Sequence, residues 1–208
     1  GLALHPNFEE NNKIYVYQTN LELEFFQNKV FSFTVDGDEL TDKQTIIDGI
    51  PGAPWHDGGR IAFGPDDKLY ITTGDAVNPG WSQDLSSLAG KILRINPDGT
   101  IPDDNPFDSS SIFSYGHRNP QGIAWSNDGL LVSSEHGPSG EMGYGHDEIN
   151  VIVKGKNYGW PKVVGDSSDD SFVNPIIHSG QTTWAPSGMV YFDSEKIPSL
   201  DGKFLVGA

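Results

Sequence analysis

Two stretches of the chain repeat one pattern: GRIAFGPDDKLYITTGD at residues 59–75 and QGIAWSNDGLLVSSEHG at residues 121–137. They align without a gap at an offset of 62 residues, which places Phe63 opposite Trp125 and Leu69 opposite Leu131. Each has a short apolar run, a polar turn, and a second apolar run that ends in small residues. This pattern predicts a β-hairpin that recurs along the chain.

Two further stretches share the design with longer turns: GLALHPNFEENNKIYVYQT at residues 1–19 and GMVYFDSEKIPSLDGKFLVGA at residues 188–208. Equivalent starts at Gly1, Arg60, Gly122 and Gly188 give spacings of 59, 62 and 66 residues. A unit of about sixty residues suits a four-stranded propeller blade with long loops. We therefore predict an all-β fold of the β-propeller type. A β-sandwich whose hairpins happen to resemble one another is the alternative.

The spacing also bounds the domain organisation. Four starts within 208 residues correspond to about three and a half to four blades. A propeller of this size cannot close, because its outermost blades would expose strand edges. We therefore expect residues 1–208 to form a single domain, a partial β-propeller truncated at both ends.

Composition limits the kinds of partner. The chain has 13 Lys and Arg against 29 Asp and Glu, a formal net charge of −16. Nucleic acids and anionic membranes are bound by basic faces, so this balance argues against both. No apolar stretch approaches the length of a membrane helix, about 18 residues, so we expect no membrane insertion. The chain has no cysteine and hence no disulfide or thiolate metal site.

The second unit carries a candidate general base. A turn centred near Pro65 and Asp66 places His56, before the first strand, opposite Asp75, after the second. A carboxylate beside an imidazole fixes its tautomer and stabilises the imidazolium, while the other ring nitrogen stays free to take a proton. The alternative is a structural Asp–His hydrogen bond where the loops meet.

The third and fourth units add chemistry at equivalent positions. The 62-residue offset maps His56 onto Arg118, and the fourth unit has Trp184 in the same place, with Thr183 beside it. Equivalent positions of neighbouring blades lie on one rim near the propeller axis, so a base, a cation and an aromatic wall are predicted to converge on one pocket.

The offset also maps Asp75 onto Gly137, and the predicted hairpin brings HRNP (residues 117–120) beside EHGP (residues 135–138). The Gly137-Pro138 pair exposes carbonyl groups that suit a hard cation such as Ca²⁺, although Gly-Pro is also an ordinary turn. The remaining histidines are interpreted as loop or rim residues, with ligand contact as the alternative for His136: His5, His117, His136, His146 and His178.

Taken together, the chain resembles the soluble quinoprotein aldose dehydrogenases of the glucose/sorbosone type. These are six-bladed propellers that use pyrroloquinoline quinone (PQQ) and Ca²⁺. The matching segments span the chain in order: GLALHPNF, HDGGRIAFGPDDKLYITTGD, LAGKILRINPDGTIPDDNPF, YGHRNPQGIAW, SEHGP, DEINVIVKGKNYGWP and APSGMVYF.

The resemblance implies catalytic roles for three residues. His56 would take the proton of the anomeric hydroxyl of an aldose while hydride passes from that carbon to the quinone. Asp75 would orient His56. Arg118 would lie against a quinone carbonyl and stabilise its developing negative charge.

It implies binding roles for four more positions. Asn119 and Thr183 would bind the cofactor, and the carbonyl groups of Gly137 and Pro138 would hold Ca²⁺. It further implies an external electron acceptor and a location in the periplasm or outside the cell.

The chain also departs from the family pattern. The segment SGEMGYGH at residues 139–146 is longer than in the simplest members, and the chain stops at Ala208, just before the place of a cofactor-binding lysine. We therefore expect this chain alone to bind the quinone poorly and to be inactive. Two other functions stay open: a calcium-dependent propeller lactonase and a non-catalytic binding module.

Overall fold

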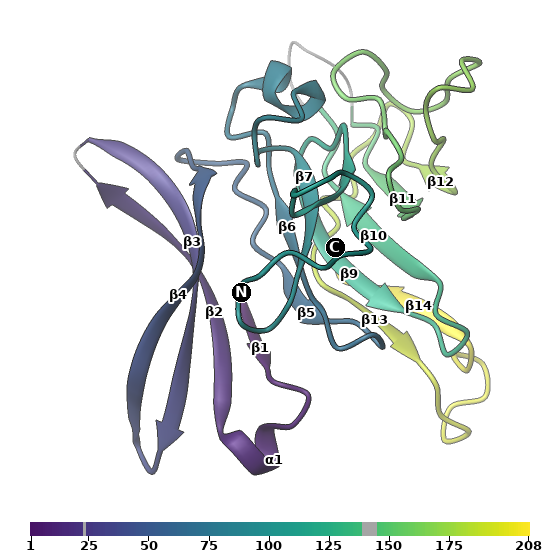
Figure 1. The fold of residues 1–208 in the computed structure, drawn as a ribbon. Coiled ribbons are helices and arrows are strands. Elements are labelled where there is room, and N and C mark those ends of the chain that lie inside the picture. The colour runs from purple at the N-terminus through teal and green to yellow at the C-terminus, as the bar shows by residue number, and fades with distance from the viewer. Residues whose placement is uncertain (23, 139–144) are drawn as a thin grey trace.

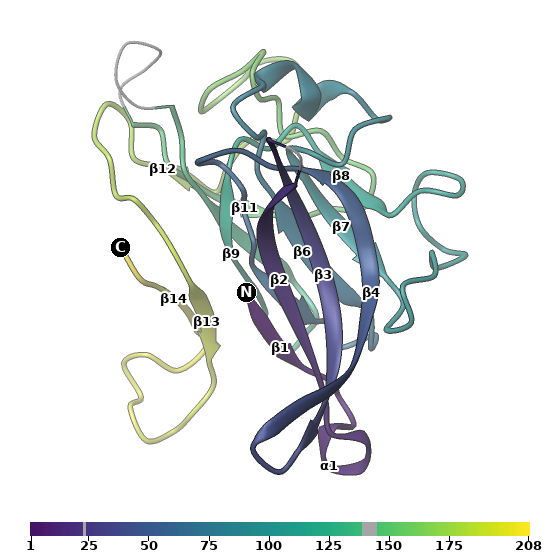
Figure 2. The ribbon, with the colours of Figure 1, turned by 90° about the vertical axis from the view of Figure 1, so that its left-hand side faces the viewer.

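A computed structural model describes residues 1–22, 24–138 and 145–208. Nearly all its regular structure is strand, in antiparallel sheets (Figure 1). The first sheet has the order β1-β2-β3-β4. Its strands are β1 (Leu2–Leu4), β2 (Lys13–Glu22), β3 (Phe25–Asp36) and β4 (Glu39–Pro51). Figure 2 shows the three long strands of this sheet side by side.

Three more sheets follow along the chain. The second contains β5 (Ile61–Phe63), β6 (Leu69–Thr73), β7 (Lys91–Ile95) and β8 (Ile112–Tyr115). The third contains β9 (Pro120–Trp125), β10 (Leu131–Glu135), β11 (Glu148–Val151) and β12 (Ile177–His178). The fourth pairs β13 (Met189–Phe192) with β14 (Lys203–Val206).

In the described part of the chain, helical structure is confined to short segments. The described helices are α1 (Phe8–Asn11) and the 3₁₀ helix η1 (Pro79–Gln83). Neither they nor any other described segment form a helix long and apolar enough to cross a membrane.

The sheets have the arrangement of successive propeller blades. Their first strands contact one another in chain order, β1 with β5, β5 with β9, and β9 with β13. Within each complete sheet the strands follow one another as an antiparallel meander. The predicted all-β propeller fold is therefore confirmed, with four sheets in the described part of the chain.

The repeat seen in the sequence is also a repeat of strand register. Ile61 pairs with Ile71 in the second sheet, and Ile123 pairs with Ser133 in the third, which preserves the 62-residue offset. The strand pairing is symmetric about Asp66, whereas the sequence placed the centre of the hairpin between Pro65 and Asp66. The predicted centre is therefore wrong by half a residue.

The turn explains the difference. Gly64 N–H donates to the carbonyl of Lys68 at 2.9 Å, which closes a three-residue loop whose last residue, Asp67, has a φ of 57°. Such loops commonly end in a left-handed residue. The backbone partner of His56 is consequently Ala76, whose N–H donates to the His56 carbonyl at 3.1 Å, rather than Asp75.

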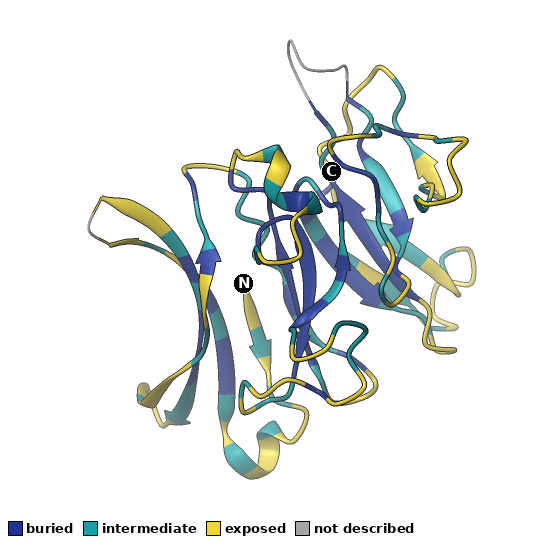
Figure 3. Cartoon of the chain, turned by 45° about the horizontal axis from the view of Figure 1, so that its top comes forward, coloured by how far each residue is buried: buried dark blue, intermediate teal, exposed yellow. Residues whose placement is uncertain are grey.

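Apolar cores lie between neighbouring sheets, and the second sheet is buried on both faces (Figure 3). Alternation along its strands sends side chains to opposite sides. Leu69, Ile71 and Leu93 join the cluster shared with the first sheet, whereas Tyr70 and Ile92 join the cluster shared with the third. The blades therefore stabilise one another through their faces.

We expect Leu93→Ala to destabilise the protein by about 2–5 kcal/mol, because Leu93 is fully buried and its loss leaves a cavity between two blades. Denaturant unfolding followed by circular dichroism measures the change. Leu40→Ala is the control, since Leu40 is 53% exposed and its truncation should cost no more than about 0.5 kcal/mol. Equal losses in both variants would contradict this account of the core.

Candidate active site

The predicted contact between His56 and Asp75 is present. His56 precedes β5 and Asp75 follows β6, and His56 Nδ1 lies 2.9 Å from Asp75 Oδ1. His56 has a φ of 65°, a left-handed conformation that is uncommon outside glycine. Gly74 permits this arrangement, because a Cβ at position 74 would lie 1.8 Å from the His56 carbonyl oxygen.

The Asp75 carboxylate is buried and fully engaged. Only 1% of Asp75 is exposed. Besides His56, Oδ1 accepts a hydrogen bond from Val77 N at 2.9 Å, and Oδ2 accepts one from Trp160 Nε1 at 2.9 Å. Because an ionised carboxylate only accepts hydrogen bonds, the proton of the neutral His56 ring lies on Nδ1.

The other ring nitrogen is not free, which corrects the expectation from sequence. Arg118 Nη2 lies 3.0 Å from His56 Nε2. The common register of the two blades brings these side chains to the same rim, where a guanidinium donor meets an imidazole acceptor. Because arginine only donates, Nε2 carries the lone pair. Asp75 and Arg118 thus hold His56 in the tautomer with its proton on Nδ1 and its lone pair on Nε2.

Arg118 lies within a ring of polar and aromatic groups. Its Nη1 donates to the His136 carbonyl at 3.2 Å, its main-chain N–H donates to the Glu135 carboxylate, and its guanidinium carbon is 5.5 Å from the Trp160 ring centroid. Burial lowers the pKa of Arg118 from its ordinary value, against the opposing effect of neighbouring carboxylates. Arg118 Nε is buried and has no hydrogen-bond partner among the described residues.

These groups surround a cavity with a volume of about 260 Å³, close to the lower end of ligand-binding pockets. Its lining consists of His56, Asp75, Val77, Pro79, Arg118, Pro138 and Trp160. The expected aromatic wall is therefore present, but it comes from Trp160. The prediction that Trp184 forms this wall is wrong, because Trp184 is 38% exposed and does not line this cavity.

One wall of the cavity is held by a buried lysine. Val77 and Pro79 belong to the loop between β6 and β7, which contains η1. Lys91 Nζ donates to the carbonyls of Trp81, Ser82 and Ala89 at 2.8, 3.2 and 2.6 Å. Burial lowers the pKa of Lys91 to about 7, while Asp84 acts in the opposite direction. Three carbonyl acceptors match the three donors of an ammonium group and fasten the loop to β7.

Asn119 and Thr183, the predicted cofactor ligands, make other contacts. Asn119 Oδ1 accepts hydrogen bonds from Gly58 N at 3.1 Å and from Gln121 Nε2 at 3.0 Å, which ties the His56 loop to the next blade. The Thr183 hydroxyl donates to Asp147 Oδ2 at 2.8 Å. Neither side chain lines the cavity, so their roles toward a cofactor stay predictions.

The Gly137-Pro138 segment, the predicted calcium ligand, lies at the cavity edge. Pro138 lines the cavity, and its carbonyl accepts a hydrogen bond from Gly145 N at 3.0 Å. The Gly137 carbonyl has no partner within the described part of the chain. The long segment singled out in the sequence lies mostly outside the described residues, at positions 139–144.

Asp147 joins this segment to the fourth blade. Its carboxylate accepts hydrogen bonds from four groups: Gly137 N at 2.8 Å, Thr183 Oγ1 at 2.8 Å, Trp184 N at 2.6 Å and Ala185 N at 2.9 Å. Burial raises the pKa of Asp147, but these hydrogen bonds outweigh burial and leave it below the ordinary value. Asp147 is 2% exposed and therefore acts as an internal clamp between two blades.

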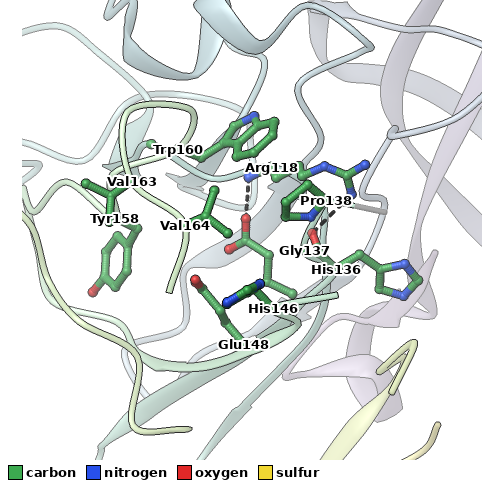
Figure 4. Close-up of a pocket in the computed structure, with 12 residues that line it drawn as sticks. Arg118, His136, Gly137, Pro138, His146, Glu148, Tyr158, Trp160, Val163 and Val164 are labelled. Carbon is green, nitrogen blue, oxygen red and sulfur yellow. Dashed lines mark hydrogen bonds between the residues drawn. The ribbon is translucent and has the colours of Figure 1, made fainter. Parts of the chain in front are cut away.

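A second cavity of about 10 Å³ lies behind Arg118 (Figure 4). Glu135 and Glu148 line it, and burial together with the Glu135 charge raises the pKa of Glu148 to about 8. Glu135 also accepts a hydrogen bond from His117 Nδ1 at 2.9 Å, and His117 Nε2 lies 2.8 Å from Ser114 Oγ. Ser114 and His117 are fully buried, so this Ser–His–Glu series supports the Arg118 backbone rather than meeting a ligand.

Sequence reasoning missed Trp160, Asp147 and Glu135 as residues of the site. All three lie in segments that carry the family resemblance, SEHGP and DEINVIVKGKNYGWP. An aspartate directly before the apolar run EINVIV and a tryptophan directly after a Tyr-Gly pair were the signals available. Among residues 1–22, 24–138 and 145–208, no group of three His, Cys, Asp or Glu side chains could hold a metal ion.

The sheets define a β-propeller. At one of its cavities the carboxylate of Asp75, the imidazole of His56 and the guanidinium of Arg118 form a hydrogen-bonded series. The family model for glucose/sorbosone dehydrogenases matches residues 1–208, and the chain belongs to that family. It is 36% identical over 202 residues to quinoprotein glucose dehydrogenase B of Acinetobacter calcoaceticus, which covers 83% of this chain and 41% of that protein.

Solved structures agree with this assignment. A glucose dehydrogenase-like oxidoreductase of Thermus thermophilus superimposes with a TM-score of 0.87 at 46% identity, over 92% of this chain and 60% of that one. The PQQ-bound aldose sugar dehydrogenase of Streptomyces coelicolor gives a TM-score of 0.84 at 39% identity, over 92% and 56%. The chain spans 41–61% of the length of three similar curated relatives.

We expect stability to fall as the pH drops from about 5 to about 2, because Asp147 must take up a proton and release its four donors. Its folded-state pKa lies below the ordinary 3.8, so its contribution is present above that pH and is lost below it. Asp147→Asn should lose about 1.5–3 kcal/mol at pH 7 and show a flatter acid dependence in chemical unfolding. Asp48→Asn, at an exposed position, is the control. An unchanged acid profile in Asp147→Asn would contradict the clamp.

Proposed function

We propose that the chain carries the catalytic rim of a PQQ-dependent dehydrogenase that oxidises the anomeric hydroxyl of aldose sugars to lactones. The observation that carries the proposal is the hydrogen-bonded series Asp75–His56–Arg118 on the edge of one cavity. It supplies a base of defined tautomer next to a fixed positive charge. Membership of the family and the printed names of its relatives support the same chemistry.

The residues present fit a planar, anionic quinone. Arg118 offers a guanidinium whose Nε has no partner in the described part of the chain, and Trp160 offers an aromatic wall. Val77 and Pro79 add apolar surface on the opposite loop. A bound anion would pair with the Arg118 guanidinium and satisfy the buried donor.

The carbonyl groups of Gly137 and Pro138 would hold Ca²⁺. Calcium takes oxygen ligands, including main-chain carbonyls. The Pro138 carbonyl keeps a second lone pair beside its bond to Gly145 N. Both carbonyls belong to a segment that Asp147 fixes through Gly137 N. This part of the proposal rests on donor chemistry and on the family resemblance.

The reaction removes a hydride from the anomeric carbon and a proton from its hydroxyl, so two electrons leave with the hydride and a lactone forms. When bound, the quinone supplies the acceptor for that hydride, and an external electron acceptor takes the electrons afterwards. His56 takes the hydroxyl proton at Nε2. Asp75 stabilises the resulting imidazolium through Nδ1.

The hydrogen bond from Arg118 Nη2 to His56 Nε2 opens before the base acts, because that nitrogen has a single lone pair. Once His56 is protonated both groups are donors, so the bond does not re-form. The released N–H can turn to negative charge that develops in the cavity. His56 thus takes the proton while Arg118, released from His56, stabilises the negative charge. The proposed location is outside the cytoplasm, in keeping with the family resemblance.

We expect His56→Gln to lower kcat by about 10²–10⁴-fold with little change in KM, because glutamine keeps a polar side chain but cannot accept the proton. The assay uses the complete gene product, loaded with PQQ and Ca²⁺, with an aldose panel and a redox dye. His5→Gln, whose ring contacts Asn7 and Asn11 in the first blade, is the control.

Other outcomes of that assay decide between functions. Lactone hydrolysis without quinone would replace the proposal by the lactonase. Absence of both activities would replace it by the binding module.

Removal of calcium should abolish both quinone binding and activity, and Ca²⁺ should restore them where Mg²⁺ does not, because Mg²⁺ demands a smaller octahedral shell. Equilibrium dialysis against a calcium chelator, followed by quinone absorbance, measures this. Quinone binding that persists in chelator would contradict the proposed role of the Gly137 and Pro138 carbonyls as Ca²⁺ ligands.

A further inference from the structure

Trp160 contacts both charged groups of the site. Its side chain lines the cavity of about 260 Å³ beside His56 and is 8% exposed. It also lines the small cavity of about 10 Å³ that Figure 4 shows. Its indole N–H donates to Asp75 Oδ2, the oxygen that His56 does not use. Its ring faces the guanidinium of Arg118, with 5.5 Å between the guanidinium carbon and the ring centroid.

The surrounding structure fixes the indole in this place. The Trp160 main chain donates to the Gly116 carbonyl at 2.9 Å and accepts from Gln83 Nε2 at 2.7 Å. Gln83, from η1, also exchanges two hydrogen bonds with the Asn157 amide, at 2.9 and 3.0 Å. A turn held at both ends leaves the indole little freedom, so its N–H is directed at Asp75.

An N–H donor to a carboxylate stabilises the anion and draws charge away from its other oxygen. Asp75 Oδ1, which holds His56 Nδ1, is therefore less basic with Trp160 in place than without it. Loss of the donor would strengthen the pull of Asp75 on the His56 proton and favour the imidazolium. It would also leave a buried acceptor unpaired.

We propose that Trp160 is a positioning residue that sets the basicity of His56 through Asp75 and keeps the Arg118 guanidinium against the cavity. The part that concerns rate rests on the proposed dehydrogenase function. The part that concerns His56 does not, because it follows from contacts within this chain. Trp160 touches no reacting atom in this scheme and acts through Asp75.

Among the described residues, few other charges face His56. Arg118 and Asp75 contact its ring directly. The neighbouring Asp57 points its carboxylate at Asn28 Nδ2 and Ala53 N instead. The carboxylates of Glu135 and Asp147 act on Arg118, one blade further along.

The test compares Trp160→Phe, which keeps a ring and removes the N–H, with Trp125→Phe. Trp125 ends β9 and packs in the core between the second and third sheets, lines neither cavity and serves as the matched control. Histidine-labelled complete protein without cofactor is titrated by NMR, with His56 assigned by its absence in His56→Gln. We expect the His56 midpoint to rise by about one pH unit in Trp160→Phe and to stay unchanged in Trp125→Phe.

A kinetic readout follows on the loaded enzyme. The acid limb of kcat/KM should move to higher pH by the same amount, so that Trp160→Phe loses about tenfold on the acid limb and little on the alkaline plateau. A structural defect would lower the rate at every pH instead. An inactive wild-type enzyme would refute the proposed function and leave the NMR result decisive for Trp160.

A measurement on the wild-type protein tests the proposal even if Trp160→Phe folds poorly. The Trp160 indole N–H and the His56 ring share Asp75, so the indole proton shift should follow the His56 titration and lose this dependence in Asp75→Asn. An indole shift that ignores the His56 titration, or an unchanged His56 midpoint in folded Trp160→Phe, would overturn the proposal.

Discussion

The charge of Asp75 is buried almost completely, and the candidate site depends on how that charge is compensated. Burying a carboxylate is costly unless donors replace the water it loses. Here the donors come from distant parts of the chain: the His56 ring, the Val77 main chain and the Trp160 indole. Asp75 N–H in turn donates to the Arg118 carbonyl at 2.8 Å. The loop ends of the second and third blades are therefore fixed by one anion.

Much of the fold could be predicted from sequence because its hairpins are local. Strands joined by short turns carry their register in the residues of the turn, so the match between residues 59–75 and 121–137 was sufficient to place His56, Asp75 and Arg118 at related positions. The error of half a residue at Asp66 did not separate His56 from Asp75, because both lie beyond the paired strands, where side chains span the difference.

The loops could not be predicted in the same way. Trp160 reaches Asp75 across 85 residues of sequence, from a segment without periodicity. Extending the repeat to the fourth unit selected Trp184 instead, because equivalence holds along strands and not along loops of different length. Asn119 and Thr183 show the same limit: their places on the rim were predicted, and their hydrogen-bond partners were not.

The contact between His56 and Arg118 crosses from one blade to the next. Its length is therefore set by how two sheets pack, through an apolar core that contains Tyr70 and Ile92. Any influence that tilts one blade against the other, such as pressure, heat or a repacked core, acts on this contact directly. The separation of these two side chains thus reports on inter-blade packing, and the proposed activity should change whenever that packing is disturbed.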